Sequence, residues 1–181
     1  MRSGRRTRRE NAGGESGFTL LELLIVVAII GIIAAIAIPG LLRARISANE
    51  ASGIGSMRTT STAQATFAAT CGGGGYATSL ADLGTPQSGG DPFIPPDLAG
   101  AFPGGVPKSG YEFTITATTG IAVMGAGETC NGTSSETEYF AIGDPVAPGF
   151  TGNRYFGLDH QGMIRQALTQ LADITDGTPL Q

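Results

Sequence analysis

Glu22 is the side chain with the clearest chemical potential, because it is a carboxylic acid set in an apolar run. It is the only ionisable residue between Phe18 and Leu42, and every residue from Leu23 to Ile38 is Leu, Ile, Val, Ala or Gly. A carboxylate near the middle of a bilayer is costly, so its surroundings should compensate it. Two solutions are open: Glu22 extends to the polar interface of the membrane, or it pairs with an opposite charge.

The sequence predicts no catalytic residue, no metal site and no cofactor. The single histidine, His160, lies beside Asp159 in a tetrad that is typical of a turn, and no Ser or Cys nucleophile shares a motif with it. Two cysteines and a distant histidine do not make a zinc site. Calcium binding is left open, because four acidic residues lack the spacing of a recognised calcium loop: Asp144, Asp159, Asp173 and Asp176.

The composition excludes several classes of protein. The 181 residues carry 11 basic and 15 acidic side chains, for a net charge of −4, and only 14% of the residues are charged. This length favours one domain with an extension over a multidomain enzyme. The acidic balance argues against a DNA-binding surface over the whole chain, since phosphates are neutralised by clustered Lys and Arg. Nucleic acid as a partner is possible but unsupported, with only Lys108, Arg154 and Arg165 as cations beyond residue 70.

The amino terminus predicts a membrane anchor. Residues 1–17 contain five Arg and two Glu, and they precede the apolar segment 18–42. That segment has 25 residues, enough to cross a hydrocarbon core of about 30 Å at ~1.5 Å per residue. Arginines next to a membrane segment stay on the cytoplasmic side, so the carboxy-terminal part should lie across the membrane.

The order of these signals differs from that of a secretory signal peptide, because the small residues Ser16 and Gly17 precede the apolar run. The stretch Gly17-Phe18-Thr19-Leu20-Leu21-Glu22-Leu23-Leu24-Ile25-Val26-Val27 resembles the type III signal of type IV prepilins and of the pseudopilins of type II secretion. The resemblance implies that prepilin peptidase cuts between Gly17 and Phe18 and that the new amino group of Phe18 is methylated. It also implies that Glu22 pairs with the amino terminus of Phe18 on a neighbouring subunit during filament assembly.

Pro39 and Gly40 predict a bend or an unwound turn, because proline removes a helical hydrogen bond and glycine lowers helix propensity. Pro39 also lies where the pilin family often has a helix-kinking proline.

Beyond the membrane segment the same helix should continue through residues 43–70. Six residues recur at helical spacing and form a stripe that is half apolar: Ile46, Gly53, Met57, Thr60, Gln64 and Phe67. This stripe should pack on a small globular head, since a coiled coil would need sustained Leu or Ile. A Gly- and Pro-rich loop is predicted over 71–110, with one short helix capped by Ser79 and ended by Gly84.

The alternation of apolar and polar residues predicts strands over 111–118, 139–142, 154–158 and 162–166. We expect a four-stranded antiparallel sheet packed on the helix, which makes an α+β fold with a head over 111–166. Residues 119–136 are interpreted as an insertion or hairpin with an edge strand over 121–124. No structure is predicted for the tail 167–181.

Cys71 and Cys130 predict a structural disulfide between the end of the helix and the insertion. Both lie in the part expected to be exported, where thiols are oxidised by default. Closing so long a loop restricts the unfolded chain by about 4 kcal/mol in the loop-entropy picture.

The whole chain is therefore predicted to be a structural subunit, a type IV pilin that polymerises into filaments for adhesion, motility or DNA uptake. Short motifs of the head, such as Ser79-Leu80-Ala81-Asp82-Leu83, are also similar to those of bacterial type IV pilins with compact heads. The implied partners are other pilin subunits, prepilin peptidase with its methyltransferase activity, an inner-membrane assembly platform and membrane lipid. The implied location is the inner membrane, with the head in the periplasm, and after assembly an extracellular filament.

Two alternatives are open. One is a pseudopilin of type II secretion or a minor pilin. The other is a membrane-anchored module that binds a ligand, such as an adhesin or a DNA receptor.

Overall fold

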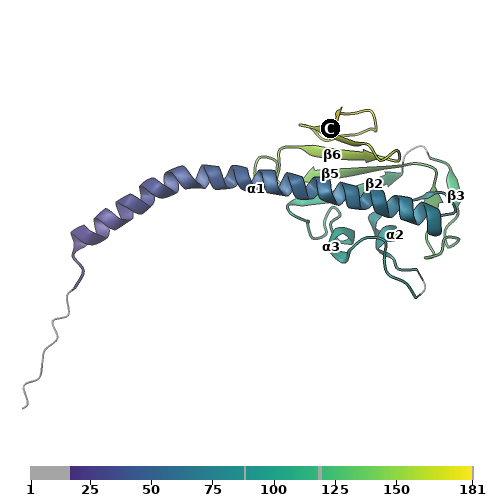
Figure 1. Ribbon diagram of the computed structural model, residues 1–181, viewed down its shortest axis with the longest axis horizontal. Coiled ribbons are helices and arrows are strands. Elements are labelled where there is room, and N and C mark those ends of the chain that lie inside the picture. Colours follow the sequence, from purple (N-terminus) through teal and green to yellow (C-terminus); the bar gives the residue numbers. More distant parts are fainter. Residues whose placement is uncertain (1–16, 88, 118–119, 181) are drawn as a thin grey trace, which may run out of the picture. The chain divides into compact units, whose positions relative to one another are not determined.

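The computed structural model of the protein describes residues 17–87, 89–117 and 120–180 (Figure 1). Residues 1–16 of the expected leader and residues 118–119 of the expected strand and insertion lie outside the described residues. The helices are α1 (Leu20–Thr70), α2 (Leu80–Gly84) and α3 (Pro96–Ala99). The strands are β1 (Tyr76–Ala77), β2 (Tyr111–Ala117), β3 (Ala122–Met124), β4 (Ser135–Glu136), β5 (Tyr139–Pro145), β6 (Tyr155–Asp159), β7 (Ile164–Ala167) and β8 (Thr178–Pro179).

The chain divides after Gly40 into two compact units, and the second, Leu41–Gln181, contains both β-sheets. Helix α1 begins at Leu20, two residues later than expected, because Thr19 caps it. The helix is unbroken at Pro39 and Gly40, so it does not unwind there, and a bend at this point stays a prediction.

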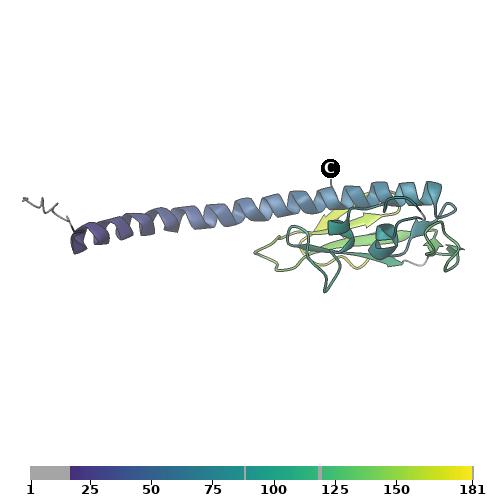
Figure 2. The ribbon, with the colours of Figure 1, turned by 90° about the horizontal axis from the view of Figure 1, so that it is seen from below.

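The predicted stripe on α1 is confirmed as the face that packs on the head. All six of its residues are buried, and Glu50, Ser56 and Ala63 are buried with them. In Figures 1 and 2 this part of α1 lies along one face of the larger sheet. Gly53 permits the close approach, since a Cβ atom there would lie 3.3 Å from the ring of Phe156 on β6.

The larger sheet is antiparallel and has five strands in the order β2-β5-β6-β7-β8. The four predicted strands are its first four members and neighbour one another as expected, but the prediction of a four-stranded sheet was wrong. The fifth strand comes from the tail, where Gln166 pairs with Thr178 and Arg165 with Pro179. A two-residue strand that ends in proline is too short to show any periodicity, and the burial of Leu171 holds this segment on the core.

A second, three-stranded sheet joins the two segments that were expected to be a loop and an insertion. Its order is β1-β4-β3, and the predicted edge strand over 121–124 is confirmed as β3. The short helix after Ser79 is also confirmed as α2, whose Asp82 N donates to Ser79 Oγ at 3.1 Å. The loop 71–110 is therefore more ordered than predicted, since it also contains β1 and α3.

The core of the head is built where α1, the larger sheet, α2 and α3 meet. It includes Phe67 of α1, Phe113 of β2, Phe156 of β6 and Leu83 of α2, each at most 2% exposed. The ring of Tyr111 packs 5.6 Å from that of Phe156, and its hydroxyl donates to the carbonyl oxygen of Arg154 at 2.8 Å. Burial raises the pKa of this tyrosine, which therefore stays neutral and a hydrogen-bond donor.

Glu50 joins α1 to the start of β6 through a charged contact. Its Oε1 accepts hydrogen bonds from the backbone N of Asn153 and of Arg154, at 2.8 and 3.2 Å, and its Oε2 accepts from Arg154 Nε at 2.8 Å. The Arg154 Nη1 in turn donates to Gln166 on β7 at 2.6 Å. A buried carboxylate with three donors is well compensated, and removing it leaves those donors without an acceptor.

We expect Glu50→Ala to lower the free energy of unfolding by about 3 kcal/mol, because it leaves Arg154 Nε and two backbone N–H groups without an acceptor. Denaturation of the full chain in detergent micelles, followed by tyrosine fluorescence, measures this loss. Asp97→Ala is the matched control: it removes an exposed partner of Lys108, so the midpoint should hardly move. Equal midpoints for both variants and the unaltered chain would contradict the structural role of Glu50.

Candidate anchoring and assembly site

The first half of α1 exposes an apolar surface on every side. The large apolar side chains between Phe18 and Leu42 are 37–88% exposed. By length and composition, α1 is able to cross a membrane, and none of its most apolar window is buried by the described part of the chain. This half of the helix needs either lipid or other protein chains around it, because water disfavours so much apolar surface.

The start of α1 is a capping box made by Thr19 and Glu22. The backbone N of Glu22 donates to Thr19 Oγ1 at 3.2 Å, and the backbone N of Thr19 donates to Glu22 Oε2 at 2.9 Å. The hydroxyl of Thr19 also donates to the same oxygen at 2.8 Å. These reciprocal bonds satisfy backbone donors that a helix start otherwise leaves unpaired. Glu22 is therefore compensated within its own chain.

Sequence reasoning missed Thr19, although the signal was readable. Threonine followed three residues later by glutamate, directly before an apolar run, is the pattern of a capping box. Phe18, the expected partner of Glu22, is 88% exposed and precedes the helix. Within one chain the structure thus brings Glu22 together with Thr19. Pairing between Glu22 and the Phe18 amino group of another chain stays a prediction.

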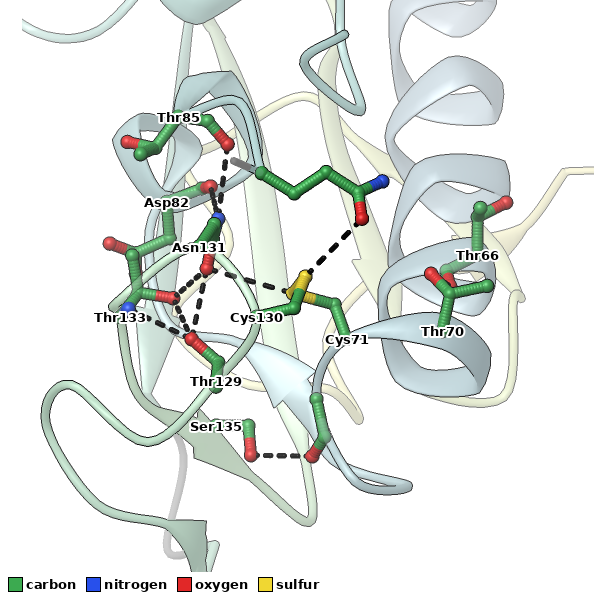
Figure 3. The surroundings of a disulfide bond; sticks show 12 residues. Thr66, Thr70, Cys71, Asp82, Thr85, Thr129, Cys130, Asn131, Thr133 and Ser135 are labelled. Carbon is green, nitrogen blue, oxygen red and sulfur yellow. Dashed lines mark hydrogen bonds between the residues drawn. A yellow bond between two sulfur atoms is a disulfide. The ribbon is translucent and has the colours of Figure 1, made fainter. Parts of the chain in front are cut away.

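The predicted disulfide between Cys71 and Cys130 is present, with the two Cα atoms 4.8 Å apart (Figure 3). It joins the residue after α1 to the segment before β4. The backbone N of Cys130 also donates to the carbonyl oxygen of Cys71 at 3.4 Å, and Ser135 Oγ donates to that of Gly72 at 2.7 Å. The smaller sheet is thereby fixed to the end of the long helix.

Asn131 extends this connection to α2. Its Nδ2 donates to the carbonyl oxygens of Asp82 and Thr85, at 2.8 and 3.1 Å, while its Oδ1 accepts from the hydroxyls of Thr129 and Thr133. Figure 3 shows Asn131 between these two groups of partners. This network was not predicted, since the partners of an asparagine in a loop have no sequence pattern.

The remaining residues with chemical potential have structural roles. Asp159 Oδ1 accepts from the backbone N of Gln161 and of Met163, at 3.0 and 2.9 Å, which confirms the predicted turn. His160 contributes its carbonyl oxygen to the hydroxyl of Tyr76 at 3.4 Å. Among the described residues, no three His, Cys, Asp or Glu side chains lie close enough to hold a metal ion.

Replacing both cysteines by serine should lower the free energy of unfolding by about 2–5 kcal/mol, because the unfolded chain regains the freedom that the bridge removes. Chemical denaturation of the full chain in micelles measures the change. A reducing agent should lower the unfolding midpoint of the unaltered chain by a similar amount and leave the Cys71→Ser, Cys130→Ser variant unchanged. If the midpoints of the two proteins agree without reductant, the bridge does not stabilise the fold.

Comparison with known proteins identifies the amino-terminal segment. Residues 13–38 match the prokaryotic N-terminal methylation motif. The chain is 68% identical over 34 residues to the type IV wide pilus major component PilA4 of Thermus thermophilus, and this match covers 19% of the chain and 26% of that relative. No solved structure matches the chain at a significant level. The amino-terminal segment of the chain therefore carries, over residues 13–38, the prokaryotic N-terminal methylation motif, and over 34 residues it is similar to the major component of a type IV pilus.

Proposed function

We propose that this chain is the structural subunit of a type IV pilus, held in the inner membrane by residues 18–42 and then polymerised through the same residues. The observation that carries the proposal is the exposed apolar half of α1, with the methylation motif at its start. Burying one Leu, Ile or Val side chain contributes about 1.5–3 kcal/mol. Lipid would bury these residues before assembly, and other copies of the chain would bury them in the filament.

Processing by prepilin peptidase fits the local structure before the helix. Gly17 and Phe18 are exposed and precede the first residue of α1, so a peptidase can reach the bond between them without unwinding the helix. Cleavage there removes the basic leader 1–17 and creates an amino group at Phe18, which is the proposed site of methylation. The new terminus is one residue from Thr19, the residue that caps α1.

The proposed pairing of Glu22 with the Phe18 amino group of a neighbour is compatible with the capping box. Both hydrogen bonds from Thr19 go to Glu22 Oε2. Within the described residues, Oε1 accepts no hydrogen bond and remains available to a donor from another chain. An ammonium group paired with a carboxylate away from water is favourable only when the two meet closely, so the pair would fix the axial position of neighbouring subunits.

Two variants of Glu22 separate its charge from its capping role. Glu22→Gln keeps the capping box but removes the charge, whereas Glu22→Ala removes both. We expect both variants to insert into the inner membrane and to lower the yield of sheared filaments at least about tenfold, because an unpaired ammonium group remains at each subunit contact. Normal filaments from Glu22→Gln with none from Glu22→Ala would show that the cap matters and the charge does not.

Mass spectrometry of sheared surface filaments tests the proposed function itself. The bulk component should be this chain, beginning at Phe18 with a methylated amino group. A short periplasmic filament with no surface pili would favour the pseudopilin alternative. Protein that keeps its leader, or that begins at another residue, would contradict the proposed cleavage between Gly17 and Phe18.

A further inference from the structure

At one end of the larger sheet, large apolar side chains are exposed and do not belong to the core. This end contains the carboxy-terminal ends of β5 and β7 and the start of β6, because Gly143 pairs with Phe156 and Ala167 with Tyr155. Three large apolar residues follow these strand ends and are exposed, and we call them the proximal patch: Val146 (49%), Phe150 (67%) and Leu168 (78%).

The loop that carries Val146 and Phe150 is held in one conformation. The backbone N of Phe150 and of Thr151 donate to the carbonyl oxygen of Ala147 at 3.0 and 2.9 Å, and the N of Ala147 donates to Thr151 Oγ1 at 3.0 Å. No residue from 145 to 152 is ionisable. A fixed loop of this kind exposes Phe150 at little cost in conformational entropy, so it is prepared for an apolar or interfacial partner.

The loop is tied to α1 close to the end of its apolar segment. Asn49 Nδ2 donates to the carbonyl oxygen of Thr151 at 2.9 Å. Asn49 is seven residues beyond Leu42, or about 10 Å along the helix axis. The headgroup layer outside the hydrocarbon core is about 5–8 Å thick on each side. At this distance the loop lies within about one side-chain length of the outer edge of the headgroup layer.

The charges around this end of the head fit an anionic lipid surface. Arg43 and Arg45 are exposed and precede Asn49 by one to two helical turns, and no ion pair joins either of them to another described residue. Asp144 is the acidic side chain nearest to the loop in sequence, and Glu112 lies opposite it on β2. Asp144 accepts a hydrogen bond from Gln170 Nε2 at 2.5 Å, and burial raises the pKa of its carboxyl group.

From this placement we infer that the proximal patch rests in the headgroup layer of the membrane that anchors α1, with Arg43 and Arg45 bound to the phosphates of anionic phospholipids. The inference rests on the proposed anchoring of residues 18–42. It assigns to the head a second contact with the bilayer before assembly, which limits the tilt of the head and directs one face of the sheet away from the membrane. An interface of aromatic and aliphatic side chains with nearby cations is what interfacial binding requires.

Tryptophan substitution tests this contact, because the chain contains no Trp and each variant therefore has a single tryptophan whose emission is selectively excited. The full-length Phe150→Trp chain is reconstituted at low protein density into vesicles of phosphatidylcholine and phosphatidylglycerol that contain brominated acyl chains. We expect a blue-shifted emission and quenching by bromine. The matched control is Ile121→Trp, 75% exposed beside β3, whose emission should resemble that in water and should not be quenched.

One further variant separates this inference from the proposed anchoring. Ile30→Trp lies within the apolar segment and reports insertion. If Ile30→Trp is quenched and Phe150→Trp is not, the patch does not touch lipid and the inference fails while anchoring stands. If neither is quenched, anchoring itself fails.

The last measurements follow how the emission and quenching of Phe150→Trp depend on protein density and on lipid charge. A blue shift of Phe150→Trp that appears only at high protein density, without bromine quenching, would assign the patch to a second copy of the chain and overturn the inference. Replacing Arg43 and Arg45 by Gln should reduce the quenching of Phe150→Trp in phosphatidylglycerol vesicles to its level in pure phosphatidylcholine. Quenching that is equal in both vesicles for the unaltered arginines would exclude anionic lipid as the partner.

Discussion

Helix α1 has to satisfy two different surroundings with one continuous set of backbone hydrogen bonds. From Leu23 to Ile38 its residues are entirely aliphatic or glycine, and all of them except the half-buried Ala34 are exposed. From Ile46 onward one face is buried by the head, and the other carries small or polar residues. A helix makes its backbone hydrogen bonds within a single segment, in lipid and in water alike, so the same segment serves both regions without interruption.

The position of the head on this helix is set mainly by polar contacts. Glu50 accepts three hydrogen bonds from residues 153 and 154, and about four turns later Gln64 exchanges two with the backbone of Ala77, at 2.8 and 2.9 Å. An apolar face alone can slide along a sheet with a small loss of contact. Two buried polar groups prevent such sliding, because any shift would separate them from their hydrogen-bond partners.

In the proposed function, one carboxylate at the start of the helix has two roles. Glu22 caps α1 through a single oxygen, and the other oxygen is unused by the described residues of its own chain. The cap gives the side chain a fixed conformation before any partner arrives. Pre-organisation of this kind reduces the entropy lost on pairing, which makes the capped carboxylate a better acceptor for an incoming ammonium group.

The sequence by itself determined the features that depend on neighbouring residues: the apolar run, the methylation motif, the helical stripe, the turn at Asp159 and the first four strands of the larger sheet. The step of three or four residues would also have revealed Glu50, which lies between Ile46 and Gly53 on the buried face. Only the tertiary structure decided the rest. Strand β8, the smaller sheet and the partners of Asn131 depend on contacts between segments far apart in the chain, and such contacts have no local periodicity.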